Sequence, residues 1–382
     1  MQRYYFDHNA TTPIADSVLE LFSKYLKDCS GNASSIHYHG QQAKMLLEQA
    51  RRQVAGLLTA SPKDIVFTSG GTEADNLAIF GTMRGNSRRH AVTTTIEHPA
   101  VLNAFAQLEQ EGFAVTYVPC DSQGTVSVDS IAQALRPDTA LVSVMHANNE
   151  LGTVQDIAAM ADVAHQAGAL FHSDGVQAAG KIPIDVTTSA VGLGVDLYAI
   201  SGHKFHAPKG VGALYVRKGV TLQPLLFGGR HEQGRRAGTE NVPALAAMGH
   251  AADIAKKAHM SSHLRDHLQR QLSECIPDIR FNAVDAPRIP NTLNVCFDGI
   301  EGESMVISLD LKGFSVSSGA ACSSGAVEPS HVLLAIGLTR AQAKSSIRFS
   351  LGPANDKQQV DNLVEAVAAS CAQLRRLSPT YA

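Results

Sequence analysis

The residue with the clearest chemical potential in this sequence is Lys204, in the segment SGHKFHAPKG at residues 201–210. An apolar run, VDLYAI, precedes it, so the lysine is expected at the end of a buried strand. Ser201 and His203 stand beside the amine, and Gly202 lets the backbone approach a ligand closely. A lone loop lysine is usually just solvated, but a lysine that forms a Schiff base with a phosphate-bearing aldehyde needs such neighbours.

A second candidate position is formed by Gly70, Gly71 and Thr72, where a predicted strand ends and a helix begins. Free amide groups and the helix dipole would point at one place there, which suits an anion. On its own the pattern indicates an ordinary helix start. Together with Lys204 it predicts a phosphate-binding cup.

Three further side chains suit an aromatic nitrogen heterocycle. Asp174, in LFHSDGVQ, could cap a helix, or it could hold a pyridinium nitrogen protonated. Gln177 is a neutral donor suited to a ring oxygen. His98, in TIEHPA, could be a satisfied histidine at a helix start, or an imidazole stacked on the ring.

The six cysteines are widely spaced, and none forms the CxxC pair of a zinc ribbon or a thioredoxin-like site. Cys322 stands in SVSSGAACSSGAVEPSH, a stretch of Ser, Gly and Ala with no packing pattern, and is the candidate for a reactive thiol. The other five fall in or beside helical or strand-like apolar patterns and are expected in the core: Cys29, Cys120, Cys275, Cys296 and Cys371.

Two motif matches fail on neighbouring residues. The segment GVQAAGK, residues 175–181, matches the first seven positions of a Walker A motif, but Ile182 replaces the required Ser or Thr and Pro183 follows. His203 and His206 have the spacing of metal ligands on a helix, but a proline and a glycine follow and no third ligand is placed. No nucleotide phosphate loop and no metal site are therefore expected.

The elements that must position these residues alternate between strand and helix from about residue 64 to residue 217. This alternation predicts a mostly parallel sheet with helices on both faces. Ligands in such sheets bind at the carboxyl ends of the strands. The interesting side chains lie at those ends: after residue 70, at 98, at 148–150, at 174 and at 201–204.

The pattern changes beyond about residue 255. One long polar helix is expected over IAKKAHMSSHLRDHLQRQLSE, followed by strand-like TLNVCFDG and SSIRFSL and a final amphipathic helix. We therefore expect a large α/β domain at residues 13–254. A smaller α+β domain would combine residues 1–12 with 255–382.

Composition excludes several classes of protein. The 382 residues carry 32 Lys+Arg against 35 Asp+Glu, so no basic field favours nucleic acid as the main ligand. No run of ~18 apolar residues predicts a membrane span. The opening MQRYYFDHNATTP has no signal-peptide pattern, so a cytoplasmic protein is expected.

Nearly the whole chain, from FDHNATTP to SIRFSLG, resembles the NifS/IscS-type cysteine desulfurases. These are class V, fold-type I enzymes that use pyridoxal 5'-phosphate (PLP). The resemblance implies a large domain built on a mostly parallel seven-stranded sheet. Ala320 departs from the family pattern, where serine is expected. The ordered motifs that carry the resemblance are SGGTEADN, TIEHPAV, ANNELG, SDGVQ, SGHK, RRAGTEN, SSGAACSSG and SIRFSLG.

The resemblance also assigns residues to the cofactor. It implies that Lys204 forms the Schiff base with PLP, and that His98 stacks on the ring and serves in acid–base catalysis. Asp174 would pair with the pyridine nitrogen and Gln177 with the phenolate oxygen. The residues expected at the phosphate are Gly71, Thr72, Ser201 and His203, with Thr239 reaching in from the partner subunit.

For the substrate, L-cysteine, the resemblance implies that Asn149 and Arg348 bind the carboxylate. A guanidinium matches a carboxylate well, although an arginine more often forms a surface salt bridge. Cys322, on a mobile loop, would accept the sulfur, giving L-alanine and a persulfide. The protein would be a homodimer that passes sulfur to an iron–sulfur scaffold or another acceptor protein, with no nucleic acid or membrane partner.

Three alternative hypotheses remain at this stage. A selenocysteine lyase would share the cofactor and most of the site. Another class V enzyme, such as an aminotransferase, would not need Cys322. A non-catalytic protein of the same fold that binds sulfur-transfer partners would not need Lys204, Asp174 and Cys322 together.

Overall fold

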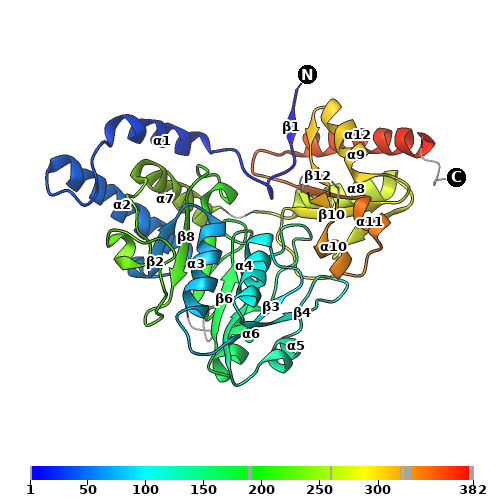
Figure 1. Ribbon diagram of the computed structural model, residues 1–382. Helices are drawn as coiled ribbons and strands as arrows, with labels where there is room; N and C mark the ends of the chain where they lie inside the picture. Colours follow the sequence, from blue (N-terminus) through cyan, green and yellow to red (C-terminus); the bar gives the residue numbers. More distant parts are fainter. Residues whose placement is uncertain (1, 188–191, 259, 319, 322–327, 378–382) are drawn as a thin grey trace.

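The computed structural model describes residues 2–187, 192–258, 260–318, 320–321 and 328–377 (Figure 1). Its larger sheet has seven strands in the order β2-β8-β7-β6-β5-β3-β4. Strand β8 runs antiparallel to both of its neighbours, and the other pairs are parallel, which confirms the mostly parallel sheet. The strands are β2 (Ile65–Thr68), β3 (His90–Thr94), β4 (Ala114–Val118), β5 (Thr139–Ser143), β6 (Leu170–Asp174), β7 (Leu197–Ser201) and β8 (Gly212–Val216).

Helices cover both faces of this sheet because its strands are apolar on both sides. Along β7, Leu197 and Ala199 pack with residues of α3, whereas Tyr198 and Ile200 belong to the cluster formed with α2, α6 and α7. Figure 1 shows α3 and α4 together on one side of the strands. The helices around this sheet are α1 (Asp16–Asp28), α2 (Tyr38–Leu57), α3 (Gly71–Met83), α4 (Pro99–Gln110), α5 (Val128–Ala134), α6 (Ile157–Gln166) and α7 (Val242–Lys257).

The second sheet is antiparallel and has the order β12-β15-β10-β9. Its strands are β9 (Ile279–Asn282), β10 (Thr292–Phe297), β12 (Ser317–Ser318) and β15 (Ser346–Ser350). Helices α8 (His263–Cys275), α9 (Gly302–Leu311) and α12 (Lys357–Leu377) share its apolar cluster. The shorter elements are α10 (His331–Ala335), α11 (Arg340–Lys344), β11 (Phe314–Ser315), β13 (Ala320–Ala321), β14 (Glu328–Pro329) and the 3-10 turns η1 (Pro62–Asp64), η2 (Gly202–Lys204) and η3 (His231–Gly234).

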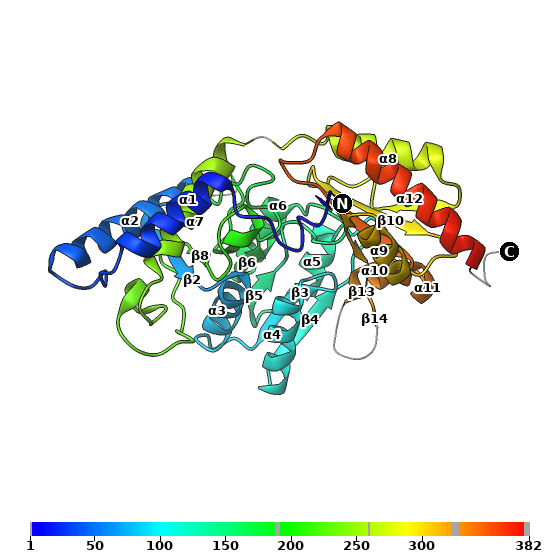
Figure 2. The same cartoon turned by 90° about the horizontal axis from the view of Figure 1, so that it is seen from above.

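The N-terminal segment connects the two sheets. Strand β1 (Tyr4–Tyr5) pairs in parallel with β11, and Phe6 is buried in the apolar cluster of the smaller sheet. Figure 2 shows the chain then running across to α1, beside the larger sheet. The expected domain limits at residues 12/13 and 254/255 stay a prediction.

The single long helix expected over residues 254–274 is wrong. Helix α7 ends at Lys257 and α8 begins at His263. The two helices belong to different parts of the fold: α7 packs on α2 and α1, whereas α8 packs on α12. Ser261 and Ser262 fall at the break, where serine is better accommodated than inside a helix.

None of the helices in the described part of the chain has the length and hydropathy that a bilayer span requires. The starts expected for two helices are confirmed, since α3 begins at Gly71 and α4 begins at Pro99. Both helices follow strands directly, so their N-termini lie at the carboxyl edge of the larger sheet. That edge holds the candidate site.

Candidate active site

Two adjacent parallel strands deliver the central side chains to one edge. Asp174 is the last residue of β6 and Ser201 is the last residue of β7, and the two strands are paired in register. Lys204 closes the turn η2 that follows Ser201. The sequence prediction that these residues share a strand edge is confirmed.

The Lys204 amine is held by main-chain carbonyl groups rather than by an acid. Its Nζ donates to the oxygen of Asn9 at 2.6 Å and to that of Ala10 at 2.9 Å. Burial, followed by the positive charge of Arg348, lowers the pKa of Lys204 to about 8, while Asp174 acts in the opposite direction. The unprotonated amine, which is the form that attacks an aldehyde, is therefore far more populated near neutral pH than in an ordinary lysine.

Helix α3 begins without a side-chain cap, and its first turn faces Ser201. The N-cap Gly70 offers no side chain, and a Cβ added at Gly71 would lie 3.4 Å from the Cβ of Ser201. The opening amides of the helix therefore lie beside a serine hydroxyl. This arrangement suits a phosphate, because free N–H groups and the helix dipole both favour an anion.

Asp174 and His98 share the electrostatic environment of the site. Asp174 Oδ1 accepts the Val176 N–H at 2.9 Å, and burial raises the pKa of its carboxyl while His98 and Lys204 lower it. His98 is the N-cap of α4, and its Nδ1 accepts the Ala100 N–H at 3.1 Å. The proton of the neutral imidazole is therefore on Nε2, and burial is the main cause of the lowered pKa of His98.

Gln177 is buried and makes two hydrogen bonds through its amide. Its Nε2 donates to Asn9 O at 2.8 Å, and its Oε1 accepts from Nζ of Lys181. The same Asn9 oxygen accepts from Lys204. The amide of Gln177 is thus placed directly beside the reactive amine.

Arg348 lies on β15 of the smaller sheet and reaches the same site. Its Nη1 donates to the main-chain oxygen of Asn149 at 3.1 Å, and its Nη2 pairs with Asp7 Oδ1 at 2.7 Å. The Nε atom is buried and has no hydrogen-bond partner among the described residues. Each Nη atom carries a second hydrogen, so the guanidinium keeps donors that can bind a carboxylate.

The remaining expected site residues differ in how closely they join this group. His203 bonds to Thr11 Oγ1 at 3.0 Å, and burial lowers the pKa of its imidazole to about 4, so it is neutral at pH 7. Thr239 is exposed on the loop before α7, in which Arg236 pairs with Glu73 of α3. Its contact with a partner's cofactor stays a prediction.

Cys322 lies outside the described residues. Of the other cysteines, Cys296 and Cys371 are buried and Cys29 and Cys120 are half-buried. The expectation of a core position is wrong for Cys275, which is exposed. This residue ends α8 just beyond the buried Leu268–Leu272 stripe.

Three functional neighbours were not predicted from the sequence. Asp7 pairs with Arg348, Asn9 bonds to Lys204 and Gln177, and Lys181 bonds to Gln177. Asp7 and Asn9 lie in the FDHNATTP motif, whose polar residues could have been assigned to the site. Lys181 belongs to the failed Walker A match, and its four-residue spacing from Gln177 was the available signal.

Comparisons with known proteins agree over nearly the whole chain. The family model for aminotransferase class-V matches residues 4–363. A cysteine desulfurase of Nostoc sp. (strain PCC 7120) is 46% identical over 385 aligned residues, which cover 99% of this chain and 95% of that protein. Two solved structures are also similar, each at 36% identity. A NifS-like protein has a TM-score of 0.90, with 97% of this chain and 100% of that chain covered. SspA in complex with cysteine has a TM-score of 0.81, with 91% and 99% covered.

The lowered pKa of Lys204 predicts a specific titration. In the cofactor-free chain, reductive methylation of Lys204, followed by peptide mass spectrometry, should show a midpoint near the pKa of about 8. In the urea-unfolded chain the midpoint should return to about 10.4. Arg348→Met should raise the folded value, because the charge of Arg348 lowers it.

The same shift sets the sign of a stability change. Between these two pKa values the unfolded chain binds more protons, so the stability contributed by Lys204 rises with pH across that window. A Lys204 midpoint equal to that of the unfolded chain would contradict the described environment.

Proposed function

This chain belongs to the aminotransferase class-V family, and we propose that it is a PLP-dependent cysteine desulfurase. The observation that carries the proposal is the convergence of a weakly basic lysine, an anion-binding helix start and a buried carboxylate at one sheet edge. The cysteine desulfurase of Nostoc sp. supports the reaction, since the similarity extends over 99% of this chain.

The donor set fits each reactive group of PLP. Lys204 supplies an amine for the aldehyde, and the opening amides of α3 with Ser201 supply N–H and O–H donors for the phosphate. Asp174 supplies a carboxylate for the pyridine nitrogen, and Gln177 supplies an amide donor for the ring oxygen. Helix α3 has 13 residues, and its first turn has no side-chain cap. Helix starts of this kind commonly bind phosphate groups.

When bound, PLP would supply an electron-withdrawing ring that weakens the Cα–H bond of an amino acid. We assign to Lys204 Nζ the removal and return of the proton at Cα of L-cysteine. The Asp174 carboxylate would keep the pyridine nitrogen protonated. His98, with its proton on Nε2, would stack on the ring and could donate that proton at the reacting face.

Arg348 would orient the substrate by its carboxylate. Asp7 and the Asn149 carbonyl hold two of its nitrogen atoms, so the guanidinium is fixed before substrate arrives. The second hydrogens of Nη1 and Nη2 would bind the substrate carboxylate. A fixed donor loses little conformational entropy on binding, which favours tight and oriented binding of an amino-acid carboxylate.

We assign the sulfur-accepting role to Cys322 on the sequence resemblance, and the persulfide would pass to an iron–sulfur scaffold or another acceptor protein. A related structure, SspA, is described in complex with cysteine, which supports L-cysteine as the substrate. We also propose a homodimer. Ile36, which is 95% exposed, and Phe227, which is 86% exposed, are large apolar side chains that a second copy of the chain could cover.

The direct test is the release of L-alanine and sulfide from L-cysteine in the presence of a reductant. The wild-type chain with bound PLP should form both in equal amounts, and Lys204→Ala should form neither, because the proton at Cα then has no base. Lys257→Ala changes an exposed lysine and serves as the control. Rates on L-selenocysteine measured in parallel distinguish a selenocysteine lyase. A PLP-loaded wild type that forms no alanine would refute the proposal, and an active Lys204→Ala would refute the assignment of Lys204.

Replacing Arg348 with lysine should chiefly weaken substrate binding. The ammonium lacks the planar fork with which the guanidinium reaches Asp7, Asn149 and the substrate at once, so KM for L-cysteine should rise about tenfold or more. The value of kcat should change much less. Arg280→Lys, at an exposed position of the same sheet, is the matched control. An unchanged KM would exclude Arg348 from carboxylate binding.

A further inference from the structure

Lys181 is a buried amine to which the proposed reaction gives no task. Its residue is 7% exposed, and its Nζ donates to Asn9 Oδ1 at 2.9 Å and to Gln177 Oε1. None of the ion pairs among the described residues includes Lys181. Burial, with the charges of Lys204 and Arg348, lowers its pKa well below the usual value. Burying an amine costs free energy, and two amide oxygens compensate this cost only in part. The position of Lys181 therefore calls for a functional explanation.

The hydrogen bonds to Lys181 and to Asn9 O together determine which way the Gln177 amide points. Lys181 Nζ donates here, so the oxygen end of the amide lies on its side. The nitrogen end then lies toward Asn9 O, to which it donates at 2.8 Å. A flipped amide would place N–H against an N–H donor and oxygen against a carbonyl oxygen, which is unfavourable at both ends.

The orientation leaves one N–H of Gln177, next to Lys204, without an acceptor among the residues that the structure describes. Nε2 carries two hydrogens, and one is used by Asn9 O. Asn9 O is also the acceptor for Lys204 Nζ at 2.6 Å. The second hydrogen is therefore presented close to the group with which the aldehyde of the cofactor would react.

We propose that Lys181 is a positioning residue that fixes the Gln177 amide with its N–H donor toward the ring oxygen of PLP. The inference rests on the proposed function, because it concerns the same site. Lys181 would not touch the cofactor, and its effect would pass through Gln177. Asn9 Oδ1 holds the amine from the other side and prevents it from turning away.

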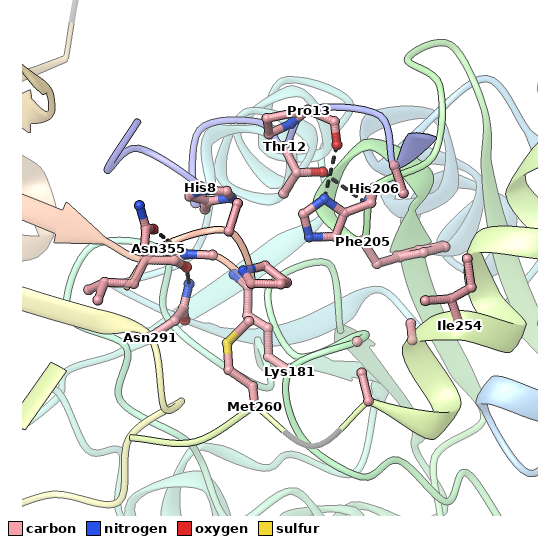
Figure 3. Close-up of a pocket in the computed structure, with 18 of the residues that line it drawn as sticks. His8, Thr12, Pro13, Lys181, Phe205, His206, Ile254, Met260, Asn291 and Asn355 are labelled. Carbon is pink, nitrogen blue, oxygen red and sulfur yellow. Dashed lines mark hydrogen bonds between the residues drawn. The ribbon is translucent and has the colours of Figure 1, made fainter. Parts of the chain in front are cut away.

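The surroundings of Lys181 can accommodate a substituted side chain without steric conflict. A cavity of about 650 Å³ adjoins it, and its lining also includes Phe205, Ile254 and Met260, which Figure 3 labels around the same space. A methionine at this position keeps the length of the stem and meets apolar neighbours. An arginine can extend into the free volume and still donate hydrogen bonds. Lys181→Met and Lys181→Arg therefore form a matched pair.

A double-mutant cycle tests the proposal. The dissociation constant of PLP and the absorbance spectrum of the bound cofactor are measured for the full chain, for Lys181→Met, for Gln177→Leu and for the double variant. Lys181→Met should weaken PLP binding by about tenfold and shift the absorbance maximum, because the amide loses its fixed orientation. In the Gln177→Leu background the same substitution should have no further effect. Lys181→Arg should restore most of the affinity.

Several outcomes would overturn the inference. These are additive losses in the cycle, a Lys181→Met variant with wild-type affinity and spectrum, or an arginine variant as weak as the methionine one. Urea unfolding of each cofactor-free variant shows whether weaker PLP binding comes from an unfolded chain or from a misoriented amide. If Lys181→Met does not fold, the comparison of Lys181→Arg with the wild type still tests the proposal. Lys257→Met is the exposed control. A wild-type chain that does not bind PLP would instead refute the proposed function.

Discussion

Asn9 is the residue on which the arrangement of both sheets and the reactive lysine depends. It is 1% exposed, and its four hydrogen-bonding groups are all engaged. The main-chain oxygen binds Lys204 and Gln177 of the larger sheet, while the main-chain N–H donates to Ser350 of the smaller one. Its side chain bonds to Lys181, Asn291, Asn149 and Thr292. Because a buried amide without partners is costly, the junction of the two bodies and the position of Lys204 are fixed together.

The charges around this junction explain why the site favours anions. Burial is the main cause of the lowered pKa of both lysines, and the positive charge of Arg348 adds to it at each. Asp174 and Asp7 oppose the shift at Lys204. The uncapped start of α3 adds further positive potential. A phosphate and an amino-acid carboxylate would both relieve this repulsion. Groups already held in place by these contacts would bind such anions at little cost in conformational entropy.

The sequence predicted the parts of the site that follow from local patterns. An apolar run followed by a polar residue places Asp174 and Lys204 at strand ends, and Pro99 marks the start of a helix after His98. The contacts of Asn9 were not predictable in this way. Its segment has no periodicity, and its partners Ser350 and Thr292 lie 341 and 283 positions away. Lys181 was not assigned a role because its segment does not match a nucleotide-binding loop. Its partners are the neutral amides of Asn9 and Gln177, so no pair of opposite charges in the sequence points to them. Long-range hydrogen bonds of this kind need the folded chain to be seen.

The most direct test of this account is the free energy of unfolding of the cofactor-free chain with Asn9→Ala, measured by urea titration and circular dichroism. The substitution removes one buried hydrogen bond from each of four partners: Lys181, Asn291, the Asn149 carbonyl and Thr292. The stability should therefore fall by about 3 kcal/mol or more. Asn103→Ala, at an exposed position of α4, should leave it nearly unchanged. An Asn9→Ala chain within about 0.5 kcal/mol of wild type would contradict the central place given to Asn9.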